Sequence, residues 1–254
     1  MKKISKILIA VLIAVSANAQ EVTQVDTIDF EEPKKNIFKF NVTSLVVNNY
    51  SFQYERVMSK RISLALGYRF MPESDIPFKS QIDIGDDEVA NYILENSQIS
   101  NMAITPEIRF YLGKKGYGRG FYVAPYYRYT KFSTDEFVFE YEGDLGSKDF
   151  KMSGEISSSS GGVMLGAQWL LSKHITLDWW IVGAHYGTSK GDLSGTPDTP
   201  MTPEEQDAVR QILEDEVDLP FVDKDVEVTA TRARMNLDGP WAGIRAGIAI
   251  GYRF

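Results

Sequence analysis

The last eleven residues of the chain, IRAGIAIGYRF at positions 244–254, decide the fold class. Successive side chains of a β-strand point to opposite faces, so strict alternation predicts a strand that separates two different environments. Here one face is apolar and the other is small or charged. The apolar positions are Ile244, Ala246, Ile248, Ile250, Tyr252 and Phe254, and the residues between them are Arg245, Gly247, Ala249, Gly251 and Arg253.

The same two-residue period recurs seven times upstream. Most of these segments exceed the 5 or 6 residues usual for a soluble strand, and they approach the roughly 9 to 11 that cross a bilayer at a tilt. Eight strands are an even number, as in bacterial single-chain barrels. We therefore predict an all-β fold, an eight-stranded antiparallel up-and-down transmembrane β-barrel. The upstream segments are 38–43, 50–55, 61–70, 102–110, 121–129, 163–171 and 175–181.

The predicted connections differ in length in a regular way. Short turns at one end and long loops at the other are typical of outer-membrane barrels, whose long loops are extracellular. A tight turn at Asn48-Asn49 after the first strand is the exception. The short turns are 58–60, 113–119 and 172–173, and the long loops are Met71 to Ser100, Lys131 to Glu155 and Gly187 to Pro240.

The long loops are predicted to carry short helices at Asp86 to Asn96 and Pro203 to Glu216. The second begins with Thr202-Pro203-Glu204-Glu205, which supplies an N-cap, a proline in the first turn and acids against the helix dipole. We expect this helix to lie over the barrel mouth. Two extensions are also expected: Phe137, Phe139 and Tyr141 prolong the fifth strand beyond the membrane, and Val226 and Val228 begin the last strand early.

The N-terminus has the composition of an export signal. Lys2, Lys3 and Lys6 precede an apolar stretch that ends in the small-residue site Ala17-Asn18-Ala19. The predicted domains are a signal peptide at 1–19, a flexible periplasmic segment at 20–36 and an outer-membrane barrel at 37–254. The predicted location is the bacterial outer membrane.

Composition excludes several classes of function. The net charge of -8 disfavours nucleic acid as a partner, because phosphate binding needs a basic face. The absence of cysteine excludes disulfides and thiolate sites, and two histidines disfavour a His-rich metal site. No cofactor or metal is predicted.

The charge is sorted by region. The three long loops sum to a net charge of -18, whereas strands and turns carry about +10. Three interpretations of the acidic loops remain open: a surface for a protein or glycan partner, divalent-cation bridging to lipopolysaccharide phosphates, or simple solvation. The predicted role is structural or binding, in contact with outer-membrane lipid and lipopolysaccharide.

The polar face of the strands predicts charged groups inside a narrow barrel. A soluble barrel would bury its apolar set inside, whereas small residues on the polar face suit the cramped interior of eight strands. Buried charges are costly alone, so these should pair, either as a structural plug of salt bridges or along a gated ion path. The predicted lumen network is Glu55, Arg61, Arg69, Glu107, Arg109, Arg128, Asp178 and Arg245.

Catalysis is not predicted. A lipid-modifying enzyme is the alternative, because His185 is expected near the outer rim with Thr188, Ser189 and Asp192 following, but no His-x-Ser pair shares a strand face.

Four further residues carry expectations about register. Pro106 and Pro125 each remove a donor from the ladder, so bulges are expected there. Trp179 is expected to face lipid and Trp241 to anchor the barrel at the membrane interface.

Two sets of residues carry a family resemblance. The C-terminal Phe254, with Tyr252 on the same face, resembles the signal that the assembly machinery of bacterial outer-membrane barrels reads. The segments Tyr54 to Phe70, Pro106 to Tyr111 and Tyr122 to Arg128 resemble a Bacteroidota outer-membrane barrel family of unknown function, similar to small OmpA-type barrels. The resemblance implies a location and an architecture, but no reaction.

Overall fold

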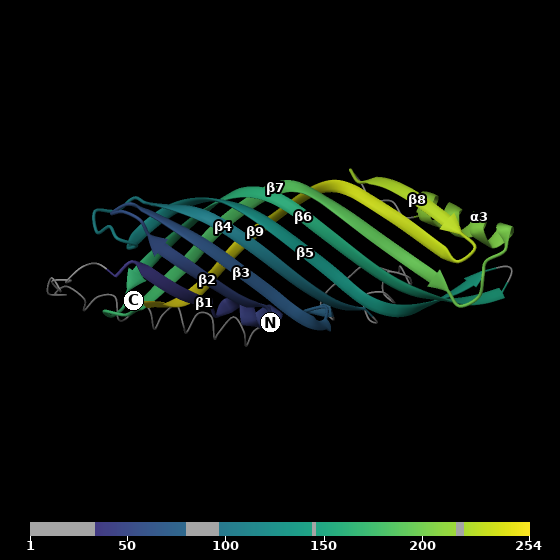
Figure 1. The fold of residues 1–254 in the computed structure, drawn as a ribbon, viewed down its shortest axis with the longest axis horizontal. Coiled ribbons are helices and arrows are strands. Elements are labelled where there is room, and N and C mark those ends of the chain that lie inside the picture. Colours follow the sequence, from purple (N-terminus) through teal and green to yellow (C-terminus); the bar gives the residue numbers. More distant parts are fainter. Residues whose placement is uncertain (1–33, 80–96, 144–145, 217–220) are drawn as a thin grey trace, which may run out of the picture. The chain divides into compact units, whose positions relative to one another are not determined.

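The computed structural model describes residues 34–79, 97–143, 146–216 and 221–254, all within one compact unit, Lys34–Phe254. Within these residues nine β-strands form one antiparallel sheet (Figure 1). The short turns and the C-terminus lie at one end, the turn end, whereas β8 and α3 lie at the other, the loop end (Figure 1). The strands are β1 Asn36–Asn41, β2 Tyr50–Val57, β3 Ile62–Asp75, β4 Gln98–Tyr111, β5 Gly120–Gly143, β6 Gly146–Leu170, β7 Ile175–Pro197, β8 Asp223–Thr229 and β9 Arg232–Arg253, and the helices are η1 Thr43–Val47, α3 Pro203–Gln211 and η3 Ile212–Glu216.

Eight of these strands close into a ring. Pairing runs in chain order from β1 to β7, continues to β9, and returns to β1 through Ile37↔Arg253. The prediction of an all-β antiparallel fold is confirmed, and the arrangement is barrel-like. The ninth strand corrects the expectation for Val226 and Val228, which belong to β8 and not to the start of the last strand. Because β1 ends at Asn41, β8 supplies the pairing along the loop-end part of β9.

Much of the sequence that we expected to form loops is strand. β5 and β6 pair in a hairpin that reaches Gly143↔Gly146 with one register shift along it, and β6 pairs with β7 as far as Phe150↔Pro197. The expected continuation of the fifth strand is therefore confirmed, but the loop boundaries at 131–155 and 187–240 are wrong. The extensions of β6 and β7 are rich in Ser, Gly and charged residues and show little apolar alternation, so their backbone pairing marks them as strand. The helix expected at Asp86 to Asn96 lies outside the described residues.

Local hydrogen bonds explain why the first strand is short. The Asn41 Oδ1 accepts hydrogen bonds from the backbone N–H groups of Thr43 and Ser44 at 3.0 and 3.2 Å, which turns the chain into η1. The helix ends at Asn48, whose φ of 54° lies in the left-handed region that asparagine tolerates. The connection after the first strand is thus a one-turn 3₁₀ helix and not the tight turn that we predicted.

The two prolines do not create bulges. Pro106 pairs with Leu66 and Pro125 with Val163 in continuous register, so that prediction is wrong. Both prolines lie on the β4–β5 boundary, where the register is the same on either side of the interrupted pairs. The ladder therefore tolerates a missing donor there without inserting a residue. The register shifts of the described strands fall between Met71 and Ser74, Thr134 and Phe137, Leu165 and Gly166, and Trp180 and Gly183.

The two faces of the ring differ sharply. Alternate side chains point inward and are buried and mostly polar, whereas the others point outward, are apolar and are exposed. Every strand of the ring contributes to this outer apolar belt, which includes Phe38, Tyr54, Leu66, Ile108, Phe121, Leu165, Val182 and Ile250. Among the described residues, no helix has the length and apolarity that a membrane crossing requires.

Candidate functional site

Five buried charged side chains meet inside the ring near the turn end. The Arg109 Nη1 contacts the Asp178 Oδ2 at 2.6 Å and the Glu55 Oε2 at 3.1 Å. The Arg109 Nη2 lies 2.6 Å from the Glu107 Oε1. The Lys39 ammonium bridges Glu55 and Asp178, with its Nζ 2.6 Å from the Asp178 Oδ2. We call Lys39, Glu55, Glu107, Arg109 and Asp178 the ion-pair cluster.

Neutral side chains satisfy the remaining oxygens of the ion-pair cluster. Glu55 accepts from the Tyr111 hydroxyl at 2.7 Å and the Ser63 hydroxyl at 2.6 Å. Asp178 accepts from the Tyr122 hydroxyl at 2.8 Å and the Trp180 indole N–H at 3.1 Å. Because each carboxylate is both paired and hydrogen-bonded, the cluster meets the condition under which buried charge is tolerated. It fills this level of the ring as a cross-linked plug.

Four basic side chains form a second group on the loop side of the cluster. We call Arg69, Arg128, His185 and Arg245 the basic chamber. The Arg245 Nη1 contacts the Glu107 Oε2 at 3.3 Å, and its guanidinium lies 4.6 Å from the Tyr126 ring centroid. Arg128 donates to the hydroxyls of Thr130 at 3.2 Å and Thr105 at 3.3 Å. The buried Nε of Arg69 has no hydrogen-bond partner among the described residues.

An aromatic contact lies farther toward the loop end. Phe132 and Trp241 approach to 5.8 Å between ring centroids, although they come from the non-adjacent strands β5 and β9. Trp241 has the inward parity of Arg245, four residues later, so the expectation of an interfacial anchor is wrong. Trp179, by contrast, is exposed on the outer face beside Trp169.

The predicted network divides between these groups. Glu55, Glu107, Arg109 and Asp178 lie in the ion-pair cluster, and Arg69, Arg128 and Arg245 lie in the chamber. Arg61 joins neither, since it is exposed in the turn before β3. Sequence reasoning missed Lys39, Gln53 and Gln168 as members, although each has inward parity; Gln53 accepts from Arg109 at 2.8 Å.

In the described part of the chain, Ser189 and Asp192 do not join His185. Its Nδ1 lies 3.1 Å from the Tyr126 hydroxyl, whereas Ser189 bonds to the Gly239 carbonyl and Asp192 pairs with Arg234. Over residues 34–79, 97–143, 146–216 and 221–254, no three His, Asp or Glu side chains are placed to hold a metal ion.

The C-terminal aromatics lie on the outer face at the turn end. Tyr252 stacks between His174 and Phe254, with ring centroids 5.5 and 6.1 Å away. Arg253 points inward, and its guanidinium donates a hydrogen bond to the Lys34 carbonyl at 2.7 Å. The Arg253 carbonyl contacts the His174 Nδ1. The last residues are thus held at the ring closure, with Tyr252 and Phe254 about half exposed.

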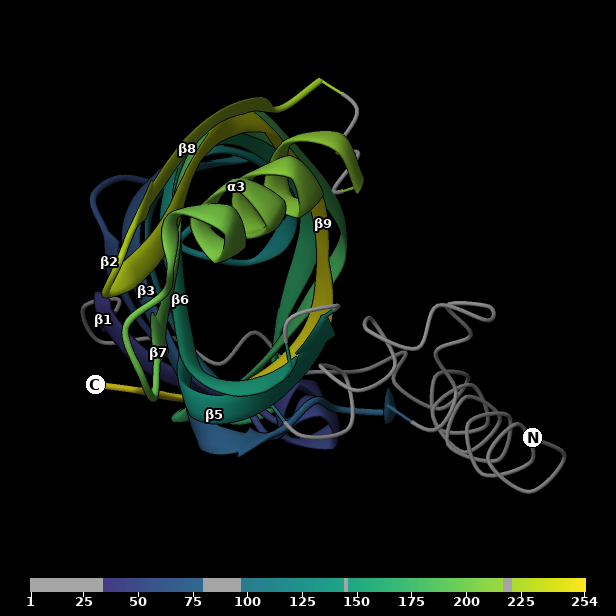
Figure 2. The same ribbon diagram turned by 90° about the vertical axis from the view of Figure 1, so that its right-hand side faces the viewer.

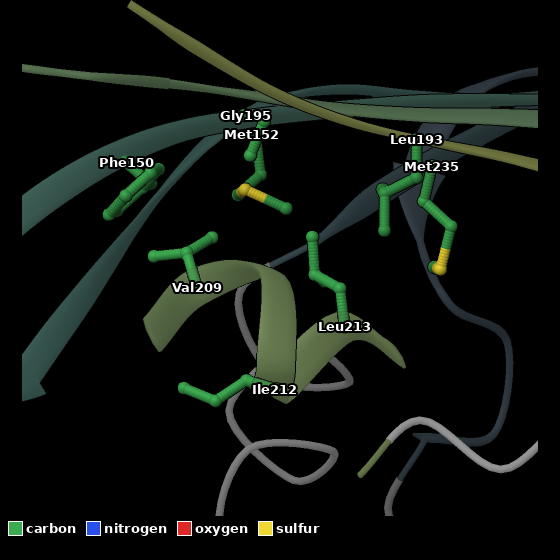
Figure 3. Close-up of a pocket in the computed structure, with 9 residues that line it drawn as sticks. Phe150, Met152, Leu193, Gly195, Val209, Ile212, Leu213 and Met235 are labelled. Atoms are coloured by element: carbon green, nitrogen blue, oxygen red, sulfur yellow. The ribbon is translucent and has the colours of Figure 1, made fainter. Parts of the chain in front are cut away.

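At the loop end, α3 packs against the inner face of the sheet. Thr202 caps the helix in a capping box with Glu205, as the sequence predicted for its N-cap, and η3 continues it to Glu216. Val209 and Leu213 point toward Phe150 and Met152, and Figure 2 shows α3 crossing the opening of the ring. An apolar pocket remains between helix and sheet (Figure 3), lined by Phe150, Met152, Leu193, Gly195, Val209, Ile212, Leu213, Ala233 and Met235.

A family model matches residues 7–192, which is most of the chain and includes every charged residue of both groups except Arg245. The family is described as "Protein of unknown function (DUF3575)". The chain belongs to this family. No curated protein and no solved structure matches it. Membership in DUF3575 assigns no reaction, so the function of this DUF3575 chain has to be argued from its own residues.

Proposed function

We propose that the chain is an integral β-barrel of the bacterial outer membrane with a structural and binding role, not an enzyme. The observation that carries the proposal is the outer apolar belt. Leu66, Phe121 and Val163 are 53%, 61% and 52% exposed, and similar side chains surround the whole ring. Soluble monomers rarely expose a continuous apolar surface of this extent, whereas lipid would cover it.

The interior supports a scaffold better than a pore. The ion-pair cluster fills the ring with paired, hydrogen-bonded side chains, and eight strands leave room for little else. A narrow gated channel is the competing role. Planar-bilayer recordings test it directly: the proposal expects no steady conductance, and a reproducible single-channel current that increases in Trp241→Asp, which removes a bulky ring from the lumen, would contradict it.

The loop end supports the binding role. It presents a folded platform of long hairpins and α3, held by the apolar contacts of Val209 and Leu213 and by the ion pair Lys148–Glu205 at 2.8 Å. The three segments that we expected to form the long loops carry a summed net charge of -18. We propose that the platform contacts a surface protein, glycan or lipopolysaccharide, and that the barrel assembly machinery reads Tyr252 and Phe254. The export signal and the Bacteroidota and OmpA-type resemblance belong to this same proposal.

Membrane insertion is tested by substituting the belt. Leu66→Asp places a charge in the outer face, and Ser51→Asp, on the buried inner face of adjacent β2, is the matched control. We expect the wild-type chain in outer-membrane fractions, with slower folding of Leu66→Asp into lipid vesicles than of Ser51→Asp. Recovery of the wild-type chain as a folded, detergent-free monomer in aqueous buffer would overturn the proposal.

The binding role is tested by photo-crosslinking in intact cells. The chain has no cysteine, so a probe placed on Cys at Glu204 or Glu227 labels only the loop end. Lys60, in a short turn, is the control position. We expect a discrete adduct from the loop positions alone, and equal labelling at all three positions would contradict the assigned role.

A further inference from the structure

The basic chamber differs from the ion-pair cluster in its charge balance. Three carboxylates point into the two groups, from Glu55, Glu107 and Asp178. Three cations contact them: Lys39, Arg109 and Arg245. Arg69 and Arg128 remain, and neither contacts a carboxylate in the described part of the chain.

These two guanidinium groups are deeply placed. Arg128 is 6% exposed, and the Arg69 Nε is buried without a hydrogen-bond partner. An uncompensated buried cation is unfavourable unless an anion or water pairs with it. The hydroxyls of Thr105 and Thr130 satisfy two donors of Arg128 but supply no charge.

The chamber therefore has the chemistry of an anion site, and we propose that it binds one phosphate-type oxyanion. Guanidinium groups present planar pairs of donors that match phosphate oxygens, and two unpaired arginines balance the charge of a dianion. His185 and Tyr126 add polar groups at the rim. Arg69 and His185 are only partly buried, so water-sized solutes reach the chamber from the lumen.

The chamber also has defined limits. The ion-pair cluster closes it toward the turn end, and the contact between Phe132 and Trp241 narrows the lumen toward the loop end. Free phosphate and a phosphorylated headgroup are the two sources of such an oxyanion, and either would enter from the loop side. The shared chemistry is the phosphate group, and the experiment separates the two sources.

The test is equilibrium dialysis of radiolabelled inorganic phosphate against the full chain folded in uncharged detergent. We expect saturation near one phosphate per chain, with affinity at least about tenfold weaker in Arg69→Gln and in Arg128→Gln. Arg61→Gln is the matched control, since it removes the same charge from an exposed turn. Arg128→Lys keeps the charge but loses the planar fork, so we expect intermediate affinity.

Competition identifies the source. Displacement by phosphorylated lipid A, but not by its dephosphorylated form, supports a lipid headgroup; displacement by free phosphate alone supports the inorganic ion. Absence of saturable binding, or equal binding in the Arg69→Gln/Arg128→Gln double variant, overturns the inference. A change in gel migration on heating confirms that each variant is folded. If Arg69→Gln does not fold, Arg69→Lys is used in its place. Because binding is measured in micelles, its failure leaves the proposed location untouched.

Discussion

Arg109 and Arg128 lie on adjacent strands of the same ring, and both are almost fully buried, yet their surroundings are opposite. Arg109 contacts three carboxylates, whereas Arg128 contacts two hydroxyls. The difference shows that burial alone does not tell what a charged residue does. A balanced group cross-links the ring, and an unbalanced one is prepared for a ligand. Three experiments test this distinction and a fourth tests the loop end, from the largest expected effect to the smallest.

Arg109→Met should have the largest effect. It leaves Glu55, Glu107 and Asp178 with the Lys39 ammonium and the Arg245 guanidinium among them, so we expect a loss of about 3 to 5 kcal/mol. Reversible urea unfolding in detergent measures it. Arg61→Met controls for the loss of a cation, and equal stability of the two variants would remove the structural role of the ion-pair cluster.

Two of the buried tyrosines, Tyr111 in contact with the cluster and Tyr126 beside the chamber, should differ in how much stability their hydroxyl groups contribute. Tyr111 donates to the charged Glu55, so Tyr111→Phe should lose about 1.5 to 3 kcal/mol. Tyr126 bonds to the His185 ring at 3.1 Å, so Tyr126→Phe should lose about 0.5 to 1.5 kcal/mol. The same unfolding assay compares them, and a reversed order would break the comparison between cluster and chamber.

Arg128→Gln should leave stability unchanged or raise it when no phosphate is present, because it removes a buried cation that lacks a carboxylate. Its thermal unfolding midpoint should then stop responding to phosphate. A loss as large as that of Arg109→Met would mean that the chamber is itself a structural element.

The smallest effect belongs to the loop end. The hydrogen bond from Lys148, together with the Thr202 backbone N–H, holds the pKa of Glu205 below its ordinary value of 4.5. Because the pKa of Glu205 is lowered in the folded protein, its ionised side chain contributes stability above pH 4.5. This contribution is lost as the pH falls through the pKa of the folded state. A fluorophore on Glu204→Cys should report loosening of α3 only below pH 4.5. Glu205→Gln should abolish this pH dependence. If the pH dependence persists in this variant, another titrating group causes it.

Alternation predicted the strands and the side on which a residue lies, because a strand has a fixed period of two. Glu55, Glu107, Asp178 and Arg245 point inward as their parity requires. Arg61 does not, because it precedes β3 in a turn, where the period has no meaning. Trp241 was misplaced for a different reason, since the parity of the last strand was not extended upstream of Ile244.

The sequence did not predict which charged residues pair inside the ring. Arg109 and Asp178 are 69 positions apart and meet only across the ring, and nothing in their local sequence favours that contact over one with Arg69. The loop-end extensions of β6, β7 and β9 were missed because their pairing comes from neighbouring backbones and not from apolar side chains. Register shifts such as Trp180 to Gly183 also change parity without a proline or other local signal.

The closure between β1 and β9 has a consequence for the order of assembly. It joins residues more than two hundred positions apart through five residue pairs, so it is the contact of highest sequence separation and among the shortest. Lys39 lies on β1, and its ammonium can reach Glu55 across the neighbouring β2, but it reaches Asp178 on β7 only when the two ends of the chain have met. Until then Asp178 has Arg109 as its only cationic partner in the ion-pair cluster. Pairing of the first and last strands thus closes the sheet and completes the ion-pair cluster in one step. The Lys39 ammonium then stabilises the closed ring by contacting both carboxylates.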